Sequence, residues 1–206
     1  MKNSERILRE LDKMVPNPKC PLNYTRDYEL LLAVMLSAQT TDERVNMVTK
    51  ELFKYDLRQL STMDTEKIEE IIKPVGTQKR KSAYIKEIAK ILLEKTDGKV
   101  PYDRAFVEGL PGVGHKTCNV VFSEIFNEPT LAVDTHVART SKRLGLAGFD
   151  ADVVEIEEAL CNFFPKSSWS KVHVQLVLFG RHKCKATKPL CDDCPFKNKE
   201  CKKTQE

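Results

Sequence analysis

The segment at residues 110–116, LPGVGHK, combines residue types that could bind a phosphate group. Two glycines one residue apart let the backbone adopt positive φ and approach another surface closely. The N–H groups of such a bend, with those of a following helix N-terminus, suit a DNA phosphate without reading any base. An ordinary helix–helix turn is the alternative, because Gly and Pro are common in turns. The residues expected to line the phosphate site are Leu110, Gly112, Val113, Gly114 and His115.

Lys116 is the candidate nucleophile of this segment. A lysine amine attacks carbon only when it is unprotonated, and a helix N-terminus and partial burial both favour the neutral amine. Most of the 34 Lys and Arg residues must be ordinary solvated cations. On residue type alone Lys116 would be one of these, and the surrounding motif is what favours catalysis.

Asp134 is the second candidate, because it directly precedes the helical segment THVAR. Aspartate is a preferred N-cap, so a purely structural role is a strong alternative. A carboxylate at a helix start can also stabilise positive charge that develops during a reaction, or move protons. The two roles are compatible.

Four of the seven cysteines crowd into the last 23 residues, which favours a metal site in a reducing compartment. Four thiolates can hold zinc or a 4Fe-4S cluster. Zinc sites usually pair two short arms, whereas only one spacing here is short, so iron–sulfur is favoured. Cys20, Cys118 and Cys161 are expected to be small buried residues. The cluster reads Cys184-x6-Cys191-x2-Cys194-x6-Cys201.

The elements that must position these residues are helices, because apolar residues recur at helical spacing and no segment alternates with period two. The run 28–36 is almost wholly apolar, which predicts a helix buried on all sides. The other expected helices are 7–15, one from the capping box Thr40-x-x-Glu43 to 52, one from 64 or 65 to Pro74, 85–98, a short one from Asp103, 115–126, 134–145, 153–163 and 168–180.

The 206 residues are 41% apolar and 31% charged, an ordinary globular composition for one or two domains. No uncharged apolar run approaches the ~20 residues of a membrane-spanning helix, and residues 1–14 lack the apolar core of a signal peptide. A cytoplasmic protein is therefore expected. Eight Lys and Arg lie between residues 181 and 203 against three acids, and Lys79-Arg80-Lys81 is a second basic run. Such patches suit a polyanion, although a solvated surface is the simpler interpretation.

Several separated motifs resemble the endonuclease III family of helix-hairpin-helix DNA glycosylases and AP lyases. They are LLLAVMLSAQTTDERVN, LPGVGHKTCNVV, LAVDTHVARTSKRLGL and the C-terminal cysteines, in the family's order. The resemblance covers the chain from about Asp27 to Cys201. It implies a 4Fe-4S cluster on the four cysteines, although the family's usual final spacing is x5 and this chain has x6.

The resemblance also implies the chemistry. Lys116 attacks the sugar C1′, displaces the damaged base and forms a Schiff base that permits β-elimination. Asp134 carries a catalytic role. The expected substrate is double-stranded DNA with oxidised pyrimidines or abasic sites. Glycosylases with another lesion preference and a non-catalytic, metal-stapled DNA-binding protein are the alternatives, and a zinc centre is the alternative for the metal.

Damaged bases must leave the stack before their glycosidic bond can be cut, and side chains fill the gap. The resemblance assigns this task to Gln39 on one side. On the other side the family usually has a large apolar residue where this chain has Thr77, and Gln78 or Lys79 could compensate. His136 is similar to a family histidine near the DNA backbone.

The expected architecture is all-α, with two helical domains flanking a DNA-binding cleft. One domain spans 21–128 and carries the helix-hairpin-helix at about 103–126. The other joins 1–20 to 129–206 and carries the cluster at 184–201. Lys116 and Asp134 are expected to meet at the cleft, and a monomer that associates with the nucleoid and not with a membrane is expected.

Overall fold

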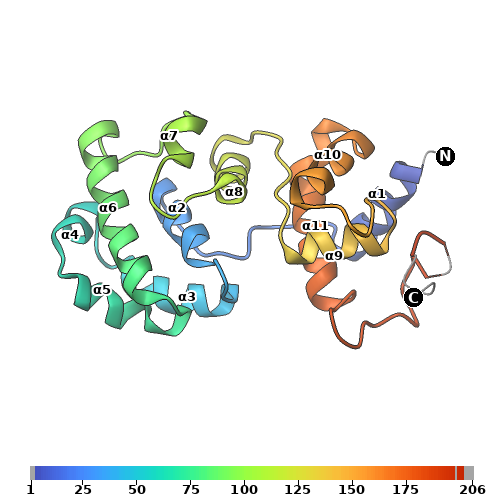
Figure 1. Cartoon of the computed structure of the whole chain (residues 1–206), viewed down its shortest axis with the longest axis horizontal. Coiled ribbons are helices and arrows are strands. Elements are labelled where there is room, and N and C mark those ends of the chain that lie inside the picture. The colour runs from blue at the N-terminus through green and yellow to red at the C-terminus, as the bar shows by residue number, and fades with distance from the viewer. Residues whose placement is uncertain (1–2, 198, 202–206) are drawn as a thin grey trace. The chain divides into compact units, whose positions relative to one another are not determined.

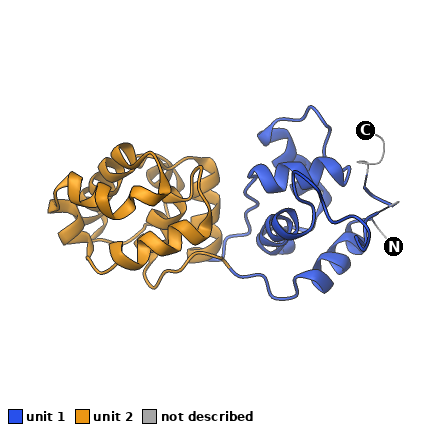
Figure 2. Cartoon of the chain, turned by 90° about the horizontal axis from the view of Figure 1, so that it is seen from below, with its two compact units in different colours: residues 1–19, 127–206 blue, residues 20–126 orange. Residues whose placement is uncertain are grey.

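The computed structural model describes residues 3–197 and 199–201, and all regular elements in these residues are helices. The predicted all-α class is therefore confirmed. The chain divides into two compact units, drawn in different colours in Figure 2. Unit 2 is the continuous stretch 20–126, and unit 1 combines residues 1–19 with 127–206. No helix in the described residues has the length and apolar character needed to cross a lipid bilayer.

Unit 2 is built around α2 (Asp27–Leu36), in which every residue from Tyr28 to Leu36 is buried. The apolar run predicted this burial, because a helix without a polar face must be enclosed on all sides. Helices α3 (Asp42–Leu52) and α8 (His115–Phe126) pack against α2, and α6 (Gln78–Thr96) packs against α4 and α5 (Figure 1). The remaining elements of unit 2 are α4 (Leu57–Thr62), α5 (Thr65–Ile72), η1 (Lys73–Val75) and α7 (Arg104–Glu108).

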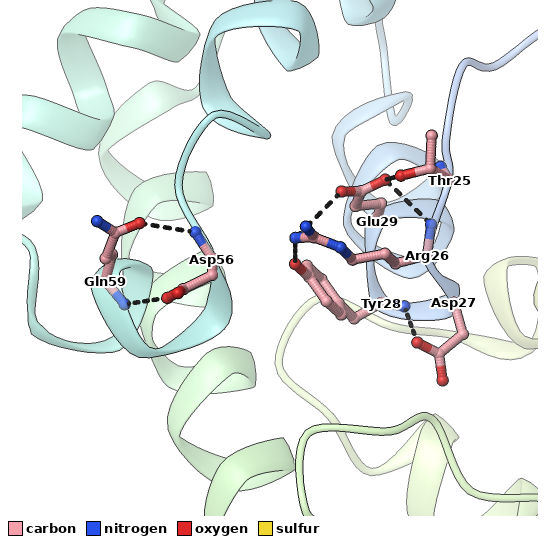
Figure 3. A network of polar contacts seen from close by, with 7 residues as sticks. All are labelled: Thr25, Arg26, Asp27, Tyr28, Glu29, Asp56 and Gln59. Atoms are coloured by element: carbon pink, nitrogen blue, oxygen red, sulfur yellow. Dashed lines mark hydrogen bonds and ion pairs between the residues drawn. The ribbon is translucent and has the colours of Figure 1, made fainter.

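The buried start of α2 needs polar partners, and Glu29 supplies them (Figure 3). Glu29 is 3% exposed, and its Oε2 accepts hydrogen bonds from the Thr25 and Arg26 backbone N–H groups at 2.7 and 3.1 Å. Asp27 Oδ2 accepts from the Val100 N–H at 2.7 Å, which joins the start of α2 to the segment after α6. The two bonds to Glu29 pair backbone N–H groups where α2 begins, and the bond to Asp27 ties that start to a neighbouring segment.

Among the local differences from the sequence predictions, one concerns a helix cap and another an additional helix. Thr41, and not Thr40, is the N-cap of α3, because Thr41 Oγ1 accepts from Arg44 N while the Thr40 N–H bonds back to Ser37 O. Helix α4 was not predicted, since it has only six residues. Its start is defined by a reciprocal capping box between Asp56 and Gln59, also visible in Figure 3.

Unit 1 joins the N-terminal helix to the C-terminal half of the chain. Gln175 of α11 is fully buried, and its amide donates to Asp12 Oδ1 at 2.8 Å and to Val15 O at 2.9 Å. Phe196, also fully buried, stacks edge-on against Phe179 and so anchors the cysteine-bearing segment to the core. The helices of unit 1 are α1 (Asn3–Met14), α9 (Thr135–Arg143), α10 (Val153–Phe163), η2 (Lys166–Ser168) and α11 (Trp169–His182).

Candidate active site and nucleic-acid interface

The predicted hairpin joins α7 to α8 through a tight turn. The Val113 N–H donates to Leu110 O at 3.0 Å, with Pro111 and Gly112 as the two central residues. Gly112 has φ +74°, the conformation that the third residue of a type II turn requires. The side chains of Leu110 and Val113 are buried, so the turn is held in the core and its backbone faces outward.

The two glycines of the hairpin, Gly112 and Gly114, lie in different surroundings, so glycine is required for a different reason at each. A Cβ on Gly112 would lie 2.5 Å from Tyr84 Cδ2 and 3.3 Å from Met35 Cγ, so the turn packs directly on α6 and α2. Gly114 does not have positive φ, which corrects the expectation that both glycines would. A Cβ there would meet no protein atom within 4 Å. The open space at Gly114 lets an external group approach the backbone at the start of α8.

A chain of polar contacts closes the hairpin. Arg104 Nη1 donates to Asn119 Oδ1 at 2.8 Å, and Asn119 Nδ2 lies 3.1 Å from His115 Nε2. His115 Nδ1 lies 3.2 Å from Glu108 Oε1. With the amide donating to Nε2, the ring of neutral His115 carries its proton on Nδ1 and donates it to the carboxylate. The network fixes α7 against the first turns of α8.

Lys116 is the second residue of α8 and is half-buried. The first N–H groups of a helix lack intrahelical acceptors and form the positive end of its dipole. In the described part of unit 2, no residue forms a hydrogen bond or an ion pair with the Lys116 amine. The amine is thus held at a helix start with no carboxylate bound to it in its own unit.

Asp134 is the N-cap of α9, as the sequence predicted. Its Oδ1 accepts from the backbone N–H groups of His136 and Val137, both at 2.8 Å. Both cap bonds use the same oxygen, so capping does not occupy Oδ2. Asp134 lies in unit 1 and Lys116 in unit 2, and their expected juxtaposition stays a prediction.

His136 lies in the first turn of α9 and is partly buried. Its Nδ1 is 3.2 Å from Nη2 of Arg139, which also donates to Gly180 O at 2.9 Å. Burial lowers the pKa of His136, which favours the neutral ring. The structure thus holds His136 against α11, and its contact with DNA stays a prediction.

Gln39 and Thr77, the two residues expected to enter the DNA stack, share an uncommon backbone conformation. Gln39 has φ +60° and Thr77 has φ +48°, in the left-handed region that non-glycine residues seldom adopt. Both side chains are exposed, in the loops after α2 and before α6. Gln78, the first residue of α6, is half-buried.

Lys81 was expected to contribute to a basic patch, and the structure corrects this. It is only 4% exposed, whereas its neighbours Lys79 and Arg80 are exposed. The Lys81 ammonium donates to three backbone carbonyls inside unit 2. The signal was present in the sequence, because residue 81 falls on the same helical face as the apolar positions 85, 88 and 92.

The four C-terminal cysteines are half-buried. Burial raises the pKa of Cys194; the Phe196 backbone N–H opposes this, and the nearby thiols of Cys201, Cys184 and Cys191 add to it. Arg143 Nη1 lies 3.5 Å from Cys184 Sγ, the kind of N–H···S contact that cluster sulfurs receive. In the described residues no group of three or more His, Cys, Asp or Glu side chains is arranged to hold a metal ion, and the centre stays a prediction.

Comparison with known proteins identifies the family to which this fold belongs. Residues 32–166 match the HhH-GPD superfamily of base excision DNA repair proteins. Endonuclease III of Bacillus subtilis is 42% identical over 198 residues, covering 95% of this chain and 90% of the relative. Endonuclease III of Escherichia coli K12 is 40% identical over 190 residues, covering 91% and 90%. This chain belongs to the endonuclease III family.

Solved structures agree with the family assignment. A trapped endonuclease III–DNA covalent intermediate matches with TM-score 0.92 and 41% identity, over 100% of this chain and 98% of that chain. A thermostable thymine-DNA glycosylase matches with TM-score 0.85 at 21% identity, which extends the fold alone to a more distant relative.

The hairpin geometry predicts different effects at its two glycines. Gly112→Ala forces alanine into positive φ against Tyr84, and we expect it to lower the free energy of unfolding by about 1–3 kcal/mol. Gly114→Ala meets open space, so its unfolding free energy should stay within about 0.5 kcal/mol of wild type while DNA affinity falls. Urea titration and fluorescence anisotropy with duplex DNA measure the two quantities. Gly148→Ala, whose new Cβ meets only Ala151 at 3.9 Å, is the control. A neutral Gly112→Ala would contradict the packing described here.

The cap at Asp134 allows its charge to be removed without losing the helix start. Asn is as good an N-cap as Asp, so Asp134→Asn should retain the unfolding free energy within about 0.5 kcal/mol. Its single-turnover base-excision rate should fall roughly 100-fold or more, because the carboxylate charge is gone. DNA affinity should change little. Equal losses in rate and affinity would instead assign Asp134 to binding.

Proposed function

We propose that this protein excises oxidised pyrimidines from duplex DNA and cleaves the strand at the resulting abasic site through an imine on Lys116. Membership of the endonuclease III family makes it a base excision repair glycosylase with AP lyase activity. The observation that carries the proposal is the match, over the whole chain, to an endonuclease III trapped covalently on DNA, together with a lysine in the first turn of α8. The lesion class and the residue roles are the proposed part.

The reaction can be written with the residues of this chain. The neutral Lys116 amine forms a bond to C1′ as the glycosidic bond breaks, and the base leaves with the bonding electron pair. Loss of the amine proton and opening of the sugar ring give the imine. Removal of a C2′ proton then expels the 3′ phosphate by β-elimination, and water hydrolyses the imine to regenerate Lys116.

Asp134 supports the early step in this scheme. Oδ1 is held by the two cap bonds of α9, which orients the carboxylate. The other oxygen can stabilise positive charge on the sugar as the base departs, or accept a proton from the lysine amine. The rigid cap supplies the preorganisation that electrostatic stabilisation needs.

Backbone N–H groups and exposed lysines are the groups proposed to bind DNA. The open hairpin at Gly114 and the start of α8 receive a phosphate. Near the cysteines, Lys183 pairs with Asp193 and Lys197 pairs with Asp192, so part of the basic charge is compensated. Exposed lysines of the same segment remain for phosphates, namely Lys185, Lys188 and Lys199. Lys202 and Lys203 lie outside the described residues.

We propose that the four C-terminal cysteines hold a 4Fe-4S cluster. The donor set fits: all four thiols are half-buried, three of them pack on the core of unit 1 (Cys184, Cys194 and Cys201), and an arginine N–H is directed at one sulfur. When bound, the cluster would hold the basic C-terminal segment against the core of unit 1. The ligands are Cys184, Cys191, Cys194 and Cys201.

The protein is proposed to act as a monomer in the cytoplasm, associated with the nucleoid through DNA.

Replacing Lys116 tests the function. Wild-type protein should release thymine glycol from a duplex and cut the strand, whereas Lys116→Ala should lose both activities by roughly 1000-fold or more while still binding. Lys90→Ala, an exposed lysine on α6, is the matched control and should be fully active. A wild-type protein that binds DNA with steep salt dependence but leaves lesions and abasic sites uncut would be a binding module.

A further inference from the structure

The buried ammonium of Lys81 makes three hydrogen bonds, all to backbone carbonyls. Its Nζ donates to Leu36 O at 2.9 Å, Ala38 O at 2.9 Å and Val75 O at 3.1 Å. An ammonium has three N–H donors, so every one is used. Burial, and then the nearby Arg80, lower the pKa of Lys81, and the carbonyls replace the water that the charge has lost.

The three carbonyls belong to two different segments. Leu36 is the last residue of α2 and Ala38 lies just beyond it, while Val75 is the last residue of η1. Carbonyls at the end of a helix lack intrahelical donors and form the negative end of its dipole, which favours a cation. Lys81 therefore joins the end of α2 to the end of η1 with one charge.

Each segment places an exposed left-handed residue next to a carbonyl that Lys81 holds. Gln39 follows Ala38, and Thr77 follows Val75 after Gly76. Such non-glycine conformations persist only where the surrounding structure determines them. The ammonium binds the carbonyls that precede both loops, so it ties one loop to the other.

We propose that Lys81 is a positioning residue for base extrusion: by binding both loops it sets the separation of Gln39 and Thr77, the side chains that the family resemblance assigns to the DNA stack. This inference rests on the proposed glycosylase function and on the stack-filling role proposed for these two residues. Lys81 touches no DNA in this account and acts only through the two loops.

Helix α6 extends the same control to the hairpin. Tyr84, one turn after Lys81, lies where a Cβ on Gly112 would be. The DNA-facing segments of unit 2 are thus held by neighbouring turns of one helix. Loss of Lys81 should therefore shift the loops that carry Gln39 and Thr77 relative to the hairpin.

The test compares two activities of each full-length variant on two duplexes. One duplex carries thymine glycol paired with adenine, whose excision requires a stacked base to leave the helix. The other carries a preformed abasic site, which has no base to extrude. The ratio of the two single-turnover rates cancels any loss of folded enzyme. Lys81→Met keeps the length of the side chain and removes the donors, Lys81→Arg restores donors and charge, and Lys90→Met is the exposed control on the same helix.

We expect Lys81→Met to lower the ratio of excision to abasic cleavage by roughly 10- to 100-fold, Lys81→Arg to recover much of it, and Lys90→Met to leave it unchanged. A 2-aminopurine opposite the lesion should also report less unstacking in saturated complexes of Lys81→Met. Equal loss of both activities, with an unchanged ratio, would mean that Lys81 only stabilises the fold and would overturn the proposal. If wild type cuts neither duplex, the glycosylase function itself fails, which is a different result from an unchanged ratio.

Discussion

Enclosure of α2 is the constraint on which the described geometry of unit 2 depends. A helix that is apolar on every face must be surrounded, and its ends must then be paired by buried polar groups. Glu29 serves the first end and Lys81 serves the second. Met35 of the same helix also lies against the turn at Gly112. The helix at the centre of the core therefore also fixes the positions of the loops that are proposed to contact DNA.

Two lysines of unit 2 show how environment divides one residue type into two roles. Lys81 is buried with three acceptors, so its charge is stabilised and its nitrogen cannot attack anything. Lys116 is half-buried at a helix start and has no bound carboxylate in the described part of its unit. A nucleophile needs an amine that is not held by acceptors, as at Lys116. A positioning residue needs fixed hydrogen bonds, as at Lys81.

Much of this arrangement could be predicted from the sequence, because period and punctuation determine helices locally. The apolar run 28–36, the cap at Asp134 and the stop near Gly98 were all predicted and are all present. Tertiary partners could not be predicted. Whether Thr40 or Thr41 caps α3 depends on a turn bond to Ser37, and Gly112 is required by the ring of Tyr84, which is 28 residues earlier. The charge of the basic triplet 79–81 alone suggests that Lys81 is an exposed cation, whereas its helical register with the apolar positions 85, 88 and 92 indicates burial.

The central chemical event of the proposed reaction is the bonding of the Lys116 amine to deoxyribose. Borohydride added during reaction with abasic duplex DNA would reduce the imine to a stable amine, and peptide mapping by mass spectrometry would locate the added sugar. We expect a single modified peptide with the deoxyribose remnant on Lys116. A remnant on any other amine, or strand cleavage with no adduct at all, would contradict it.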